Sequence, residues 1–225
     1  MPIQFQLEQT IPKLVAPFLP NDIDLIVDSF KSYYEEEGVR VGQVASQEEA
    51  YERIVFAIIS VNSPFDATCK AWQAVKEVDN RSKWDIYHAL HTPGSDGVVM
   101  YQPTKASWIG TLYRSAFEDG ISLMPSDMDD NQYRLYLQHN VKGLALAKGS
   151  FAAMLCKGAA DICCIDTHMH RLFSGQPARK GVGKKKYLLM EDNVREIAQR
   201  HGVATSVAQH CLWDSLRGQQ SRLLP

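Results

Sequence analysis

The sequence has little that would place it in a membrane or send it out of the cell. None of its apolar runs approaches the length of about 18 residues that a membrane-spanning helix needs. It also lacks a basic leader followed by an apolar segment, the pattern typical of secretion signals. We therefore expect a monomeric protein of the cytoplasm that makes no contact with membranes.

Cysteine is scarce, and the number of cysteines is odd. The chain has five of them: Cys69, Cys156, Cys163, Cys164 and Cys211. An odd number of cysteines in a chain without a secretion signal indicates reduced thiols. We therefore expect no disulfide.

Strand patterns are rare as well, since only residues 97–100 and Ile162–Ile165 form short apolar runs of the kind that strands use. Apolar residues recur instead at helical spacing along most of the chain. We expect helices within the first forty residues, after a capping box at 46–49, and at 66–76, 84–91, 101–117, 131–139, 148–156, 167–173, 187–201 and 204–216. The sequence therefore predicts an all-α fold.

The most informative stretch runs from Val141 to Phe173. It begins with a short hairpin that contains Gly143 and opens a helix of small and apolar residues. Gly158 stops that helix, because glycine is favoured just past the last helical turn. Asp166 then stands where the next helix begins, and aspartate is a preferred N-cap residue.

The hairpin is suited to holding an anion. Gly143 and Ala145 leave little side-chain bulk around the backbone N–H groups at the start of the following helix. Asp166, 18 residues after Lys148, lies at a second helix N-terminus, where the helix dipole favours its ionised form. An anion seat and an ionised carboxylate thus follow one another closely in the sequence.

The charge distribution indicates the kind of partner. The chain carries a net charge of −2, but residues 139–186 hold nine lysines and arginines against two aspartates. This segment therefore carries +7 and the remainder −9. A basic segment that coincides with the hairpin is typical of a site for a polyanion. The alternative is a solvated surface, which we favour for Lys184–Lys186 alone.

The sequence of this stretch resembles that of the helix-hairpin-helix DNA glycosylases of the endonuclease III superfamily (HhH-GPD). The hairpin VKGLALAKG at 141–149 is followed at the family's spacing by IDTHMHR at 165–171. The resemblance covers about residues 50–218. It implies one HhH-GPD-like unit over 1–225 with two helical subdomains flanking a cleft, approximately 45–140 and 1–44 plus 141–225.

The resemblance also implies an enzyme, a DNA glycosylase-like hydrolase that cleaves the N-glycosidic bond of a flipped, modified base in double-stranded DNA. Asp166 would be the catalytic carboxylate, stabilising the positive charge that develops on the sugar. Asn62 would fill the gap left by the extruded base. The residues that would contact DNA are Lys142, Gly143, Leu144, Ala145, Ala147, Asn62, His168 and Arg171. Without the resemblance, Asp166 would be interpreted as an N-cap and Asn62 as part of a helix connection.

Lys148 is the candidate for an amine nucleophile, which family members that also cut the strand carry in this helix. Counting back from Asp166 places Lys148 at the family's interval, but counting forward from Gly143 places Ala147 on the lysine's position. One residue turns a side chain by about 100° on a helix. The offset counts against strand cleavage and leaves Lys148 open to interpretation as a phosphate contact or a surface lysine.

No cofactor is expected. Many family members end in four cysteines that hold an iron–sulfur cluster, whereas this C-terminal region has only Cys211. Cys163 and Cys164 point to opposite sides of an extended segment, and His168 and His170 diverge by roughly 200° on a helix, so a metal site is not expected. We interpret them as core thiols and as helix-surface or DNA-facing histidines. The resemblance does imply a monovalent cation at the hairpin.

Two other functions fit the same residues. A base-modifying enzyme of the bacteriophage type, which attaches an amino acid to a modified thymine, could use the same fold. A DNA-binding module without catalysis is the second alternative.

Overall fold

The computed structural model describes residues 20–78, 81–91, 99–125, 127–175, 182–218 and 220–225, and within these ranges the chain forms ten α-helices and no β-strand. The helices are α1 (Pro20–Val41), α2 (Gln47–Ile59), α3 (Phe65–Lys76), α4 (Lys83–Ala89), α5 (Gln102–Phe117), α6 (Asp130–Asn140), α7 (Leu146–Lys157), α8 (Thr167–Ser174), α9 (Lys184–His201) and α10 (Thr205–Arg217). The all-α prediction is confirmed. None of the helices in the described ranges is long and apolar enough to cross a membrane.

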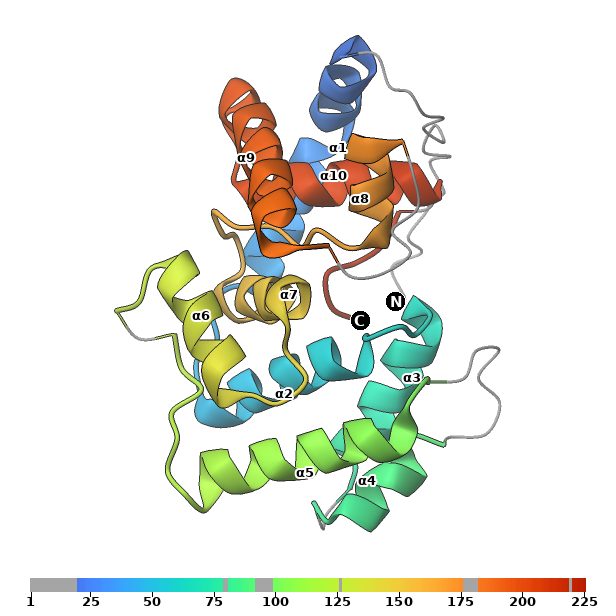
Figure 1. The fold of residues 1–225 in the computed structure, drawn as a ribbon, viewed down its shortest axis with the longest axis vertical. Helices are drawn as coiled ribbons and strands as arrows, with labels where there is room; N and C mark the ends of the chain where they lie inside the picture. Colours follow the sequence, from blue (N-terminus) through green and yellow to red (C-terminus); the bar gives the residue numbers. More distant parts are fainter. Residues whose placement is uncertain (1–19, 79–80, 92–98, 126, 176–181, 219) are drawn as a thin grey trace, which may run out of the picture.

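The helices form two groups that are joined through α6 and α7. Helices α2 to α5 make up one group, and α1, α8, α9 and α10 make up the other, with α6 and α7 between them (Figure 1). Each group has its own buried hydrophobic cluster. The predicted subdomain boundary near residue 140 stays a prediction; the buried side chains of α7, beyond that boundary, belong to the cluster built around α2.

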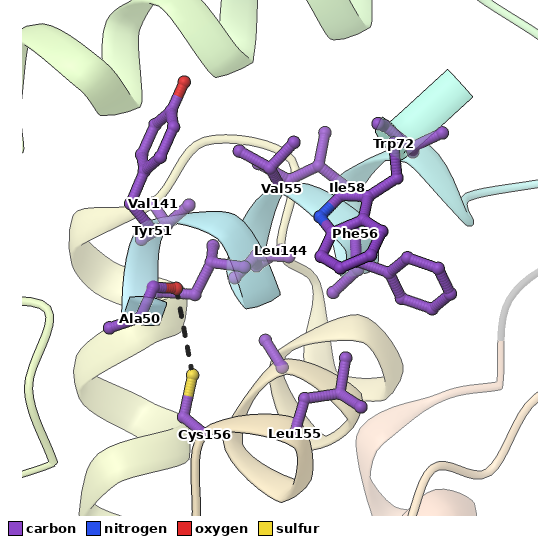
Figure 2. Close-up of a cluster of buried hydrophobic side chains, with 14 of the residues drawn as sticks. Ala50, Tyr51, Val55, Phe56, Ile58, Trp72, Val141, Leu144, Leu155 and Cys156 are labelled. Atoms are coloured by element: carbon purple, nitrogen blue, oxygen red, sulfur yellow. Dashed lines mark hydrogen bonds between the residues drawn. The ribbon is translucent and has the colours of Figure 1, made fainter. Parts of the chain in front are cut away.

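Helix α2 is the centre of the first cluster. Nine of its thirteen residues are buried, because α7 covers one side of the helix and α3 and α5 cover others. Figure 2 shows Phe56 beside the Trp72 ring, with Leu144 and Leu155 approaching α2 from the hairpin and α7. The thiol of Cys156 contacts the carbonyl oxygen of Ala50 at 4.0 Å (Figure 2). The hairpin and α7 are thus fixed against a largely buried helix.

The second cluster joins both ends of the described chain. Ile26, Val27 and Phe30 of α1 pack with apolar residues of α9 and α10. Met169 of α8 and Ile165, just before α8, are buried in the same cluster. Helix α8 therefore packs on a cluster that residues of α1, α9 and α10 form.

A buried ion pair connects the two groups of helices. The guanidinium of Arg134 on α6 lies 2.7 Å from the carboxylate of Glu191 on α9, and both side chains are almost completely buried. Arg134 also donates to the hydroxyl of Ser150 on α7 at 3.2 Å. Removing one partner of such a pair leaves an uncompensated buried charge, which typically costs about 3–5 kcal/mol.

Two predicted helix boundaries are wrong by a few residues. Helix α7 begins at Leu146 rather than Lys148, because Ala145 takes the extended conformation of an N-cap without offering a side-chain cap as a sequence marker. Helix α9 begins at Lys184 rather than Tyr187. Lysines in a first helical turn oppose the helix dipole, so the sequence pattern disfavoured a start there.

The capping box predicted at Ser46 forms only in part. The hydroxyl of Ser46 accepts from the N–H of Glu49, as expected. The Glu49 carboxylate, however, accepts from the N–H of Ala45 at 2.7 Å and pairs with Arg53. A complete capping box is found instead at Asp129 and Gln132, where α6 begins.

Candidate active site

The hairpin between α6 and α7 depends on Gly143. Its φ angle is +91°, a left-handed conformation that favours glycine. A Cβ atom at this position would lie 2.4 Å from Cε3 of Trp108 on α5. The indole ring therefore lies directly against the turn, which neither a side chain nor another backbone angle would allow.

The start of α7 offers backbone N–H groups that lack intrahelical partners. Ala145 is the N-cap residue and is exposed, as is Lys142. Leu144 is buried in the first cluster, and Ala147 packs against both clusters. The hairpin thus turns apolar side chains inward and a lysine and a helix N-terminus outward, an arrangement that suits an anion.

Asp166 is the N-cap of α8, as predicted. Its Oδ1 accepts from the N–H groups of His168 and Met169 at 2.9 and 3.0 Å. Its Oδ2 accepts from the indole N–H of Trp213 on α10 at 2.8 Å. The carboxylate is partly exposed and is held through both oxygens, so its orientation is fixed before any substrate arrives.

The segment that leads to Asp166 is fixed by side chains of α9. The hydroxyl of Tyr187 donates to the carbonyl of Cys163 at 2.6 Å and accepts from the N–H of Ile165 at 3.2 Å. Glu191 accepts from the N–H of Cys163 at 3.0 Å. Residues 162–165 form no strand, because their backbone bonds to these side chains rather than to a neighbouring strand.

Lys148 lies in the first turn of α7, is partly buried and contacts the turn that follows α2. Its Nζ donates to the hydroxyl of Ser60 at 2.8 Å and lies 5.0 Å from the centre of the Phe151 ring. Burial raises the pKa of the Cys164 thiol to about 12; the Lys148 ammonium opposes this rise and the Asp166 carboxylate adds to it. Lys148 and Asp166 therefore act on the same buried thiol and lie in the same part of the molecule.

Ser60 begins the turn 60–63, which follows α2 and carries Asn62. Asn62 is exposed and has a φ angle of +51°, which is uncommon for a residue other than glycine. Lys105 of α5 lies under the turn and is completely buried, with an exposed fraction of 0%. Its Nζ donates to the carbonyls of Ile59 and Val61 at 2.7 and 2.5 Å and to the hydroxyl of Ser63 at 2.8 Å.

The predicted residues of α8 lie on different faces of that helix. His168 is exposed and meets the Trp213 ring edge-on, with ring centres 6.3 Å apart. Arg171 is exposed one turn further along the helix. His170 is buried, with its Nδ1 3.1 Å from the hydroxyl of Ser174, so its interpretation as a surface or DNA-facing residue is wrong. Helix α8 packs on α10, and His170 lies on a buried part of α8 together with Met169 and Leu172.

A sequence comparison decides the family. The family model of the 8-oxoguanine DNA glycosylases (Ogg-HhH) matches residues 34–203, which include the hairpin, Lys148 and Asp166. The chain belongs to the 8-oxoguanine DNA glycosylase family. The predicted helix-hairpin-helix DNA glycosylase, an enzyme of base excision, is thereby confirmed. A search among curated proteins finds no match.

Solved structures of the same family share the fold. The 8-oxoguanine DNA glycosylase of Thermotoga maritima superposes with a TM-score of 0.68 at 18% sequence identity, covering 88% of this chain and 96% of its own. The 8-oxoguanine glycosylase/lyase of Methanocaldococcus jannaschii, in complex with a 15mer DNA containing 8-oxoguanine, gives a TM-score of 0.65 at 18% identity and covers 89% and 92% of the two chains. The fold of this Ogg family member is therefore that of known glycosylases.

Three residues of this Ogg-family chain hold parts of the site in place and were not predicted from the sequence. Trp213 holds Asp166, Tyr187 holds the segment before it, and Lys105 holds the turn that carries Asn62. Only Lys105 had a recognisable marker, because it shares a helical stripe with the buried residues Ile109 and Leu112. The roles assigned to the predicted site residues themselves stay predictions.

Proposed function

We propose that this chain removes 8-oxoguanine from double-stranded DNA, with Asp166 as the catalytic carboxylate and Lys148 as the nucleophile. The observation that carries the proposal is the match of the family model to residues 34–203, which include both Asp166 and Lys148. The interval of 18 positions back from Asp166 assigns the nucleophile's position to Lys148. Ala147, the other candidate position, has no amine and packs against the two clusters.

The chemistry divides between the two side chains. The carboxylate of Asp166 stabilises the positive charge that develops on the sugar as the bond between C1′ and the base breaks. The base leaves with the electron pair of that bond and takes up a proton. A neutral amine of Lys148 forms a bond to C1′ and gives up one proton, which the departing base takes. The bond between C1′ and the ring oxygen then breaks, the oxygen keeps the electron pair and takes a proton from solvent, and a protonated Schiff base remains. Such an adduct precedes cleavage of the DNA strand, so we propose a lyase activity as well.

The hairpin would hold the DNA backbone. We propose that a phosphate accepts from the N–H groups at the start of α7, with Lys142 beside it, and that the exposed side chains of His168 and Arg171 face the same strand. Asn62 would fill the gap left by the extruded base. A monovalent cation suits the carbonyl oxygens of the turn at Val141–Leu144, which is closed by a long hydrogen bond of 3.4 Å. We also propose that the enzyme acts as a monomer.

The test is release of the base from a duplex that carries 8-oxoguanine opposite cytosine, read by mass spectrometry, with borohydride trapping of the covalent adduct. We expect free 8-oxoguanine and a trapped protein–DNA adduct. Lys148→Gln should abolish the adduct, while Lys31→Gln, a partly exposed lysine of α1 paired with Asp28, should leave it unchanged. Released base without an adduct would contradict the role of Lys148.

The same assay separates the alternative functions. A DNA-binding module would leave the base in place, and a base-modifying enzyme would change the mass of the DNA without releasing a base. A duplex that stays intact with 8-oxoguanine and with other oxidised bases would overturn the proposal.

A further inference from the structure

The turn 60–63 is built around the amino group of Lys105. In its protonated form this group has three N–H donors, and it faces three oxygen acceptors, on Ile59, Val61 and Ser63. The contacts begin at the last residue of α2 and continue across the turn. Lys105 therefore closes the C-terminal end of α2, where carbonyl oxygens lack helical partners.

A lysine is an unusual choice at this position. Lys105 lies in line with the buried residues Ile109, Leu112 and Ala116 of α5, a stripe that otherwise holds apolar side chains. Burial and, to a smaller extent, the nearby ammonium of Lys148 together lower the pKa of Lys105 to about 7. An apolar side chain would avoid this cost of burial. The lysine is therefore better explained by what it holds than by the stability of the core.

The turn that it holds touches two predicted functional residues. Asn62 lies at its exposed tip in a left-handed conformation, which for a residue other than glycine persists only when the surroundings impose it. Ser60 donates to the carbonyl of Ala57 at 2.8 Å and accepts from Lys148 at 2.8 Å. The position of Asn62 and the contact to Lys148 thus both depend on the shape of this one turn.

We propose that Lys105 is a positioning residue for base excision. It holds the turn 60–63 in the shape that presents Asn62 to the gap in the DNA. Lys105 itself touches neither the base nor the sugar. This inference rests on the proposed function.

The test compares wild type and Lys105→Met on two duplexes. The first carries 8-oxoguanine opposite cytosine, so that extrusion leaves a gap in a stacked helix. The second carries 8-oxoguanine opposite an abasic-site analogue, so that the lesion is already unpaired and poorly stacked. On the first duplex we expect the single-turnover rate of base release to fall about a hundredfold, as misplacement by a distant substitution can cause. On the second duplex we expect the rate to fall less than about tenfold, because filling of the gap matters less there.

Two control variants separate positioning from stability. Leu112→Ala removes a buried side chain from the same helix, about two turns beyond Lys105, and should destabilise the protein without disturbing the turn. Assayed well below its melting temperature, this variant should release the base from both duplexes at the wild-type rate. Lys31→Met controls for the loss of one positive charge at the surface of α1.

A milder variant covers the case in which Lys105→Met does not fold. Ser63→Ala removes one of the three acceptors around Lys105. We expect it to slow release from the cytosine duplex about fivefold, the equivalent of one hydrogen bond of about 1 kcal/mol, and to leave the other duplex unaffected.

The outcomes are distinguishable. Equal losses on the two duplexes, or no loss on either, would overturn the positioning role of Lys105. A wild-type protein that releases the base from neither duplex would instead overturn the proposed function.

Discussion

Two helix ends near the candidate site are capped by charged side chains. The two capping residues differ greatly in how far they lie along the sequence from the backbone groups that they cap. The N-terminus of α8 is closed by Asp166, which bonds to N–H groups two and three residues away. The C-terminus of α2 is closed by Lys105, which reaches back over 42 to 46 positions from α5. Both closures match the sign of the helix dipole. The first can be predicted from adjacent residues, whereas the second exists only once α5 is folded against α2.

Asp166→Asn should remove the negative charge while keeping the N-cap of α8. Asparagine is as good an N-cap as aspartate, but its NH2 group would face the indole N–H of Trp213, so the free energy of unfolding should fall by about 1–3 kcal/mol. Base release should fall about a thousandfold, because the neutral amide no longer stabilises the charge on the sugar. Single-turnover release and thermal unfolding measure the two effects. Asp192→Asn, an exposed residue of α9, should change neither.

Retention of base release in Asp166→Asn would mean that Asp166 is a helix cap and nothing more.

Gly143 combines a local and a distant requirement. In Gly143→Ala the alanine must adopt a positive φ angle, and its Cβ must fit against the Trp108 ring. We therefore expect this substitution to lower the free energy of unfolding by about 2–4 kcal/mol. Gly120 also has a positive φ, +74°, but a Cβ there would have nothing within 4 Å. Gly120→Ala should therefore cost only about 1 kcal/mol. Urea unfolding of both variants measures the difference.

Adding Trp108→Ala to each glycine variant sharpens this prediction. The second substitution should recover part of the loss in Gly143→Ala and none in Gly120→Ala. Equal costs for the two glycine variants would show that the indole ring moves away freely.

Lys105 should make the stability of the fold depend on pH. Its pKa of about 7 in the folded chain lies below the ordinary lysine value of 10.5. Between these values the unfolded chain holds a proton that the folded chain has released, so raising the pH favours the folded state. We expect the free energy of unfolding to rise by up to about 1.4 kcal/mol per pH unit in this window.

Urea unfolding at several pH values in the window checks this slope. Lys105→Met should lose the part of the slope that belongs to Lys105. A wild-type slope identical to that of the variant would place the pKa of Lys105 near the ordinary lysine value.

Lys142 gives the smallest expected effect, since it is exposed beside the hairpin and would contact DNA only through charge. Lys142→Gln should reduce the slope of log affinity against log salt by about 0.9, the equivalent of one phosphate contact. Fluorescence anisotropy with labelled duplex at several salt concentrations measures it. An unchanged slope would place the phosphate elsewhere.

The sequence predicted those parts of the site that depend on neighbours in the chain. The all-α fold, the cap at Asp166 and the turn at Gly143 all follow from short patterns of residue type. The family followed from two such patterns at the right spacing. In contrast, the hydrogen bond from Trp213 to Asp166 joins residues 47 positions apart, and no pattern among the neighbouring residues predicts it.

The wrong predictions have the same origin. His170 looked like a surface residue because its helix is short and polar, but packing of α8 in the folded chain buries it. The lysines at the start of α9 looked like a loop because their charge opposes the helix dipole. In both cases packing between distant elements overrides a local preference.

The separation of the two hydrophobic clusters has a consequence for synthesis on the ribosome. The cluster around α2 uses mostly residues between Val41 and Cys164, which emerge consecutively, so it can form while the rest is still being made. The apolar face of α1 that carries Val27 and Phe30 finds its main partners in α9 and α10. We expect α1 to emerge early and to leave its apolar face exposed until nearly the whole chain has been translated. This exposure makes α1 the segment most in need of a chaperone.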